Sequence, residues 1–215
     1  MRWSEIREMT SKSGAYIAPA RSGTGRPILL LHTWWGLNQP IKDLADRLGG
    51  DGFTVLAPDL FNGKVLTTIE EADAHGREMD QEYERILGLV TAGLDELLAR
   101  PDVRGKRAGI IALSFGAWYA FKVASARPET AALICIYGDV FKGPNGVAYL
   151  GHFAEHDQFV DPAGQELRTA IDRGEAYLYP GTKHWFMERD RPEYNADAAE
   201  LVYQRSLEFL RRHLA

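Results

Sequence analysis

The sequence predicts an α/β protein built on a mostly parallel sheet with helices on both of its faces. Short apolar runs alternate along the chain with amphipathic stretches at helical spacing, which is typical of parallel strands joined by helices. The runs are almost wholly apolar, as expected of strands that are buried on both sides. With 215 residues, of which 45% are hydrophobic and 26% charged, the chain has the size and composition of one globular domain spanning residues 1–215.

The expected elements follow in chain order. Strands are predicted at 28–32, 53–57, 108–113, 131–137, 146–153 and 176–179. Helices are predicted at 40–48, 69–100, 115–126, 162–173 and 196–214. The second helix should break near Gly76, and Pro162 should open the fourth, where its missing N–H is harmless. Residues 1–20 are expected to add an edge strand or a hairpin.

The charge pattern argues against a nucleic acid partner. The net charge of −5 is spread over both signs without a block of like charges, whereas nucleic-acid binding needs a basic face. The most basic stretch, from Arg205 to His213, shares its predicted helix with Glu200 and Glu208, so we interpret it as a solvated helix face. No apolar run reaches the roughly 18 residues of a membrane span, and the N-terminus lacks the apolar core of a secretory signal.

The single cysteine, Cys135, lies in an apolar run that predicts a buried strand. A lone cysteine cannot form an internal disulfide, which fits a reducing compartment. Its apolar surroundings favour a core side chain over a nucleophile. We therefore expect a cytoplasmic protein, monomeric or homodimeric, whose partner is a small-molecule substrate and neither a nucleic acid nor a membrane.

Ser114 stands where an apolar strand runs into a helix. This strand–serine–helix arrangement over residues 108–118 is typical of a nucleophile elbow, which exposes the serine hydroxyl on a strained turn. Strand and helix approach closely there, so small residues are needed two positions before and after the serine. Ala112 and Gly116 meet this need, although glycine is more usual than alanine at the first position. A serine at a helix start can also serve only as an N-cap, and this alternative stays open.

A serine nucleophile needs a base, and an acid that orients the base. Folds with this kind of elbow carry the three residues in the chain order serine, acid, histidine. His152 is predicted inside a strand and His213 inside the last helix, whereas His184 lies in the loop between the last strand and that helix. We therefore predict His184 as the base. His32 precedes the serine and is expected to pack or hydrogen-bond beneath its own loop.

The predicted acid is Asp157, which directly follows a predicted strand. Asp161 competes with it, but the proline that comes next is typical of a residue that caps a helix start. Glu155 and Asp139 are weaker candidates. Asp157 is therefore the residue that we expect to orient His184.

Two backbone N–H groups are expected to bind the oxyanion of the reaction intermediate. The first belongs to Phe115, at the start of the helix that follows the serine. The second should lie in the loop after strand 28–32, where we choose Trp34. Trp34 and Trp35 fit equally well as core or lid aromatics, but their place at the carboxyl end of a strand predicts that at least one lines the pocket. Thr33, Trp35 and Trp185 are our expected substrate contacts.

Several stretches of the chain resemble the dienelactone hydrolase family. They are residues 31–38, 41–48, 53–63, 151–160 and 179–186, and the similarity keeps a consistent order over residues 15–212. The resemblance implies an α/β-hydrolase fold without a large cap domain. It places the catalytic residues on Ser114, Asp157 and His184, the same residues that chain order and loop position select.

The chain departs from the family pattern at three positions. Well-known members have a cysteine nucleophile at the position of Ser114, and a glutamate that serves the thiol at the position of Thr33. An arginine that helps bind the substrate carboxylate is replaced by Glu188, with Arg189 beside it. These departures imply a serine that relies on His184, and a substrate other than an anionic dienelactone.

Together these expectations describe a hydrolase that cleaves small carboxylic esters, lactones or thioesters through an acyl-enzyme. No metal or organic cofactor is expected, because the sequence has neither a Cys/His ligand cluster nor a glycine-rich phosphate loop. Among enzymes, the alternative is an acyltransferase or a carbon–carbon hydrolase with the same three residues. Outside enzymes, the alternative is a non-catalytic binding protein with this fold.

Overall fold

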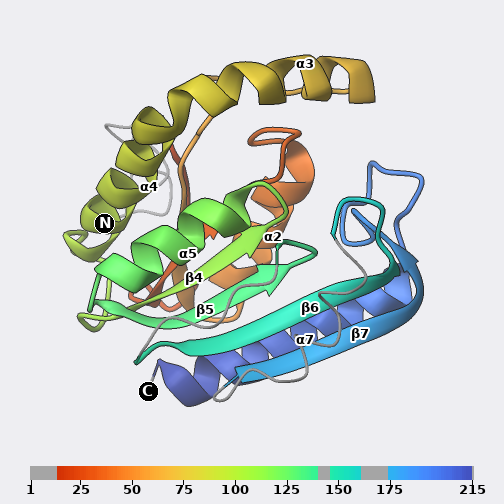
Figure 1. The fold of residues 1–215 in the computed structure, drawn as a ribbon. Helices are drawn as coiled ribbons and strands as arrows, with labels where there is room; N and C mark the ends of the chain where they lie inside the picture. Colours follow the sequence, from red (N-terminus) through yellow and green to blue (C-terminus); the bar gives the residue numbers. More distant parts are fainter. Residues whose placement is uncertain (1–13, 140–145, 161–173, 215) are drawn as a thin grey trace. The chain divides into compact units, whose positions relative to one another are not determined.

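A computed structural model describes residues 14–139, 146–160 and 174–214 of the chain. The chain forms two compact units, Met1–Ala108 and Gly109–Ala215, and each combines strands with helices (Figure 1). Neighbouring strands pair in parallel in both units, with one antiparallel exception near the N-terminus. The predicted α/β class with mostly parallel strands is therefore confirmed.

The first unit contains three strands within its described residues, β1 (Tyr16–Ala18), β2 (Arg26–Leu31) and β3 (Phe53–Ala57). They lie in the order β1-β3-β2, with β2 parallel and β1 antiparallel to β3. Every residue of β3 and all but the first of β2 are buried, as their apolar sequences predict. The strand expected within residues 1–20 is β1.

Helix α2 (Gln39–Gly50) joins β2 to β3 and packs on β1 and β3. The side chain of Asn38 caps its first turn by accepting a hydrogen bond from the N–H of Ile41 at 3.3 Å. The helix continues two residues past the predicted end at Leu48. The chain then turns at Gly52, whose φ of +94° suits glycine.

The long helix predicted over 69–100 is divided into α3 (Ile69–Met79), the 3₁₀ turn η1 (Asp80–Glu82) and α4 (Tyr83–Leu98). The break predicted near Gly76 is wrong, because Gly76 lies inside α3. One glycine inside a helix disfavours it by only about 1 kcal/mol. The helical segment is interrupted at η1 instead. After it, α4 packs its buried side on β2 and β3.

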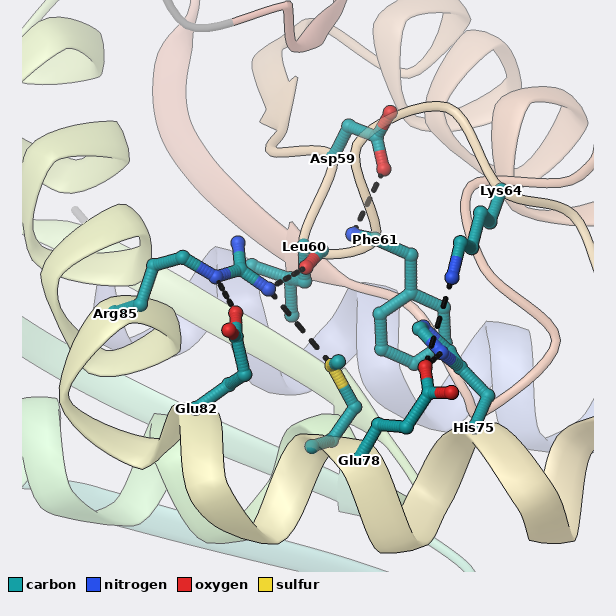
Figure 2. A network of polar contacts seen from close by, with 9 residues as sticks. Asp59, Leu60, Phe61, Lys64, His75, Glu78, Glu82 and Arg85 are labelled. Atoms are coloured by element: carbon teal, nitrogen blue, oxygen red, sulfur yellow. Dashed lines mark hydrogen bonds and ion pairs between the residues drawn. The ribbon is translucent and has the colours of Figure 1, made fainter.

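Arg85 ties the loop after β3 to this pair of helices (Figure 2). Its Nη2 donates to the carbonyl oxygen of Leu60 at 3.2 Å, and its Nε pairs with the carboxylate of Glu82. A buried backbone carbonyl needs such a donor. The contact therefore holds the loop against the turn between α3 and α4.

Glu78 makes a second link between α3 and the same loop (Figure 2). Its carboxylate lies 3.0 Å from Nδ1 of His75 and 3.6 Å from Nζ of Lys64. These side chains border a cavity of about 610 Å³. Lys64, Arg77 and Arg85 on its border each pair with a carboxylate.

The second unit contains four strands within its described residues: β4 (Ala108–Leu113), β5 (Thr130–Ile136), β6 (Ala148–His156) and β7 (Gly174–Lys183). They lie in the order β4-β5-β6-β7. β6 and β7 extend beyond their predicted ends, because their pairing continues past a register shift to His156 and Lys183. Helix α5 (Gly116–Ala126) contacts β5. The helix predicted over 162–173 lies outside the described residues.

Helix α7 (Ala196–His213) packs on β5 and β6 and runs along β6 and β7 (Figure 1). Its basic residues contact other parts of the same unit. The guanidinium of Arg205 lies 3.9 Å from the ring centroid of Tyr177, and Arg212 Nη2 pairs with Glu175 at 2.6 Å. These contacts place Arg205 and Arg212 against β7, whereas the predicted absence of a nucleic acid partner stays a prediction. In the part of the chain that the structure describes, no helix has the length and apolar character of a membrane span.

Candidate active site

Ser114 lies between β4 and α5 in a strained backbone conformation. Its φ is +46°, a region that residues other than glycine rarely adopt and that recurs at functional sites. Its N–H donates to the carbonyl oxygen of Ile136 at 3.0 Å. The N-cap of α5 is Phe115, without a side-chain cap bond, so the serine does not occupy the capping position that was the open alternative. The local geometry is that of a nucleophile elbow.

His184 follows β7 and meets Ser114 across 70 residues of sequence. Its Nε2 lies 2.8 Å from Ser114 Oγ, within hydrogen-bond distance. Its Nδ1 lies 2.7 Å from Oδ2 of Asp157. Because an ionised carboxylate only accepts hydrogen bonds, Nδ1 carries the proton and Nε2 is left to accept one from the serine.

Asp157 holds the imidazole and its own loop at once. While Oδ2 faces His184, Oδ1 accepts from the N–H groups of Phe159 at 2.9 Å and Val160 at 3.2 Å. The side chain is 2% exposed. Three hydrogen bonds compensate for the burial of its charge. The carboxylate is therefore fixed in direction as well as position.

The competing acids differ in position. Glu155 is exposed and accepts from the N–H of Gly181 at 2.8 Å, and Asp139 is exposed as well. Asp161 lies outside the described residues. Of the described candidates, Asp157 is the one that contacts His184.

Aromatic rings surround the imidazole of His184. The ring centroid of Tyr137 lies 4.9 Å from it, that of Phe159 also 4.9 Å, and that of Trp185 5.2 Å. Tyr137 is fully buried and Trp185 is 3% exposed, whereas Phe159 is 45% exposed. His184 therefore lies in a packed aromatic setting with one ring that reaches solvent.

Glu188 does not lie at the surface. It is 1% exposed, and Oε1 accepts a hydrogen bond from the hydroxyl of Tyr137 at 3.1 Å. Burial raises the pKa of Tyr137 well above its ordinary value, and the nearby charge of Glu188 raises it further. Tyr137 is therefore a neutral donor to a carboxylate, while the neighbouring Arg189 is exposed.

The other predicted site residues are distributed between the two units. Trp185 packs against His184 with little exposed surface. Thr33, Trp34 and Trp35 belong to the first unit, where Thr33 and Trp35 are buried and Thr33 Oγ1 accepts from the N–H of Trp35 at 3.3 Å. The oxyanion role of Trp34 and the substrate contacts of Thr33, Trp35 and Trp185 stay predictions.

His32 and His152 are both buried, and each makes hydrogen bonds within its own unit. Nε2 of His32 accepts from the N–H of Leu60 at 3.1 Å, and burial lowers the pKa of His32 to about 4. His152 lies 2.7 Å from the hydroxyl of Tyr179 and 3.0 Å from that of Ser206, and burial lowers its pKa to about 3. Both are neutral structural histidines, as expected for His32. Among the described residues, no three His, Cys, Asp or Glu side chains are grouped to hold a metal ion.

Tyr137 and Phe159, which contact His184, were not predicted from the sequence. Phe159 was detectable, because an aspartate commonly holds the N–H two residues later, which places Phe159 beside whatever Asp157 contacts. Tyr137 directly follows β5, the neighbour of β4, and residues at the carboxyl ends of adjacent parallel strands gather at one edge. Both signals were present in the sequence, yet neither specifies which face of His184 the ring covers.

Comparison with known proteins gives the same family that the motifs resemble. The model of the dienelactone hydrolase family matches residues 13–214. A protein of Azospirillum brasilense with the provisional name carboxymethylenebutenolidase is 30% identical, over 93% of this chain and 93% of its own length.

Solved structures agree on the fold. A provisionally named dienelactone hydrolase from Klebsiella pneumoniae has a TM-score of 0.77 and 21% identity, and the match covers 92% of each chain. A dienelactone hydrolase-like promiscuous phosphotriesterase from metagenomic libraries has a TM-score of 0.75 and 18% identity, over 90% of this chain and 88% of its own. These neighbours have the predicted α/β-hydrolase fold, and the match of the family model over nearly the whole sequence shows that this chain belongs to the dienelactone hydrolase family.

Proposed function

We propose that the chain is a serine hydrolase that cleaves small, uncharged carboxylic esters, lactones or thioesters through an acyl-enzyme. The observation that carries the proposal is the pair of contacts at His184, 2.8 Å to Ser114 Oγ and 2.7 Å to Asp157 Oδ2. A serine hydroxyl is a weak nucleophile until an adjacent base removes its proton. Membership of a hydrolase family supports the same reaction class.

In the acylation step, Ser114 Oγ attacks the carbonyl carbon while its proton passes to Nε2 of His184. Asp157 stabilises the imidazolium that forms, because its carboxylate accepts from Nδ1. The bond to the leaving group then breaks, and the leaving oxygen or sulfur takes the proton from Nε2. The acyl group remains on Ser114.

In the deacylation step, water takes the place of the leaving group. His184 removes a proton from the water, whose oxygen attacks the acyl carbon. Ser114 then leaves with the proton from Nε2, and the carboxylic acid is released. The proposed steps use neither a metal nor an organic cofactor.

The negative charge that develops on the carbonyl oxygen needs preorganised donors. The N–H of Phe115 is our proposed first donor, since Phe115 follows the serine at the start of α5, where backbone N–H groups point out of the helix. The N–H of Trp34 stays the predicted second donor.

The preference for uncharged substrates rests on Glu188. Where well-known family members have an arginine for a substrate carboxylate, this chain has a buried glutamate bonded to Tyr137, whose ring contacts His184. A carboxylate in a poorly solvated setting repels another anion more strongly than it would in water. An anionic ester should therefore bind worse than its neutral counterpart.

The proposal is tested with Ser114→Ala and a matched control. Ser114→Ala should abolish hydrolysis of p-nitrophenyl acetate and labelling by a fluorophosphonate probe. Ser125→Ala, on the exposed side of α5 where the hydroxyl donates to the carbonyl of Phe121, should change neither. Hydrolysis retained by Ser114→Ala would rule the mechanism out. An unlabelled Ser114 in a protein without turnover would favour the non-catalytic alternative.

A further inference from the structure

Phe159 brings a solvent-exposed aromatic ring against the proposed base. It is 45% exposed, while its ring centroid lies 4.9 Å from that of His184 and 5.1 Å from that of Trp185. A single exposed apolar side chain needs no explanation by itself. The position of this ring does, because it is the exposed member of the aromatic set around the imidazole.

The other two rings at His184 cannot offer the same surface. Tyr137 is fully buried and Trp185 is 3% exposed. Trp185 packs against Phe159 and supports it, with ring centroids 5.1 Å apart. Of the three, only Phe159 presents a broad apolar face that a bound molecule can cover.

The same carboxylate that orients the base also fixes Phe159. Asp157 Oδ1 accepts from the N–H of Phe159 at 2.9 Å, and Oδ2 faces His184 Nδ1 at 2.7 Å. One carboxylate therefore holds both the imidazole of His184 and the backbone that carries the Phe159 ring. Such preorganisation favours a specificity contact, because a held backbone lowers the entropy lost when the substrate binds.

The proposed chemistry determines which part of the substrate comes near this ring. The leaving-group atom must take its proton from His184 Nε2, so it lies within about 2.6–3.2 Å of that nitrogen. Any substituent on the leaving atom therefore starts beside the imidazole, against which the half-exposed ring of Phe159 packs. We propose that Phe159 forms a leaving-group subsite that selects esters of aromatic or other bulky apolar alcohols. This inference rests on the proposed function.

The test compares two esters of one acid. Benzyl acetate and methyl acetate give the same acetyl-enzyme and differ only in the apolar leaving group. In Phe159→Ala, the ratio of kcat/KM for benzyl acetate to that for methyl acetate should fall by about tenfold, the size of an aromatic contact. Phe159→Leu, which keeps an apolar side chain, should lower the ratio by a smaller factor and carries the test if the alanine variant does not fold.

Two controls make the result specific. The ratio of kcat/KM for methyl phenylacetate to that for methyl acetate should not change in Phe159→Ala, because these two esters differ in the acyl group and share the leaving group. Leu178→Ala removes another exposed apolar side chain of the same unit, 46% exposed, and should leave both ratios unchanged. An unchanged benzyl-to-methyl ratio in Phe159→Ala, or a change in the acyl pair instead, would overturn the subsite.

The failure of the subsite can be told apart from failure of the proposed function. If wild-type protein hydrolyses the acetates and a fluorophosphonate labels Ser114, an unchanged ratio rejects only the role of Phe159. If the wild type shows neither hydrolysis nor labelling, the serine mechanism fails, and the leaving-group subsite fails with it.

Discussion

The hydroxyl of Tyr137 donates to Oε1 of Glu188 at 3.1 Å, and both side chains are buried. The ring of Tyr137 lies 4.9 Å from that of His184, and its backbone has a φ of +36°. A non-glycine residue in this region stores strain that its surroundings must offset. We infer that the bond to Glu188 helps to hold Tyr137 in place behind the imidazole.

Removal of this hydroxyl should destabilise the protein. Tyr137→Phe leaves a buried carboxylate with one donor fewer, which should cost about 1–3 kcal/mol and lower the Tm by about 2–4 °C for each kcal/mol. Urea unfolding and a thermal melt measure the effect. The control is Tyr177→Phe, whose hydroxyl donates at 3.3 Å to the partly exposed Glu175 and whose loss should change stability by less than about 0.5 kcal/mol. Equal losses in the two variants would contradict the inference.

Asp157→Asn should impair the base without unfolding the protein. Because Oδ1 accepts from two backbone N–H groups, the asparagine oxygen should take that place and turn its NH₂ toward His184. Nδ1 must then accept, which moves the ring proton to Nε2 and blocks proton removal from Ser114. We expect kcat for p-nitrophenyl acetate to fall by about 10³–10⁴, with an unchanged circular dichroism spectrum. The exposed Asp190→Asn should retain activity, and a loss below about tenfold in Asp157→Asn would argue against this tautomer.

Cys135 should be inert in the folded protein even though family members use a cysteine nucleophile. It is fully buried, and burial raises the pKa of its thiol to about 12. Only the thiolate reacts. Ellman's reagent at about pH 8 should therefore label the protein only in denaturant, and iodoacetamide should leave esterase activity intact. Rapid labelling of native protein together with loss of activity would contradict this prediction.

Local sequence predicted the elements that carry the candidate site. The bounds expected for β3 and β4 match the structure, since both are short apolar runs with clear ends. The turn at Ser114 was also predictable, because a strand that runs directly into a helix leaves few ways to arrange the residue between them. Chain order then selected two side chains that the structure brings into contact with each other and, through His184, with the serine.

The features that could not be predicted from the sequence depend on packing between distant parts of the chain. The sequence singled out Glu188 for its charge, but it did not predict that the side chain is buried and accepts a hydrogen bond from a tyrosine 51 residues earlier in the chain. The helix break at 80–82 instead of Gly76 follows from the packing of α4 on two strands, which outweighs the helix propensity of one glycine. Neither outcome is encoded in a local pattern.

The two buried histidines should make stability depend on pH. The folded-state pKa is about 4 for His32 and about 3 for His152, whereas each is about 6.5 in the unfolded chain. As the pH falls below about 6.5, the unfolded state binds protons that the folded state does not, so stability decreases with acidification. Each histidine should lower the free energy of unfolding by about 2 kcal/mol as the pH falls from about 7.5 to about 5. The stabilisation that these neutral histidines provide is therefore complete only at a pH above about 6.5, their pKa in the unfolded chain.

Urea unfolding at a series of pH values measures this effect, and a variant assigns it. His152→Gln keeps a polar group near Ser206 but does not titrate, so it should reduce the loss of stability between about pH 7.5 and about pH 5 by about 2 kcal/mol. His156→Gln, which removes a histidine whose side chain is 63% exposed, is the control for the substitution itself. If His152→Gln does not fold, proton uptake on unfolding of the wild type at about pH 5.5 carries the test, with about two protons expected from His32 and His152. Stability that is independent of pH over this range would show that these histidines are protonated in the folded protein.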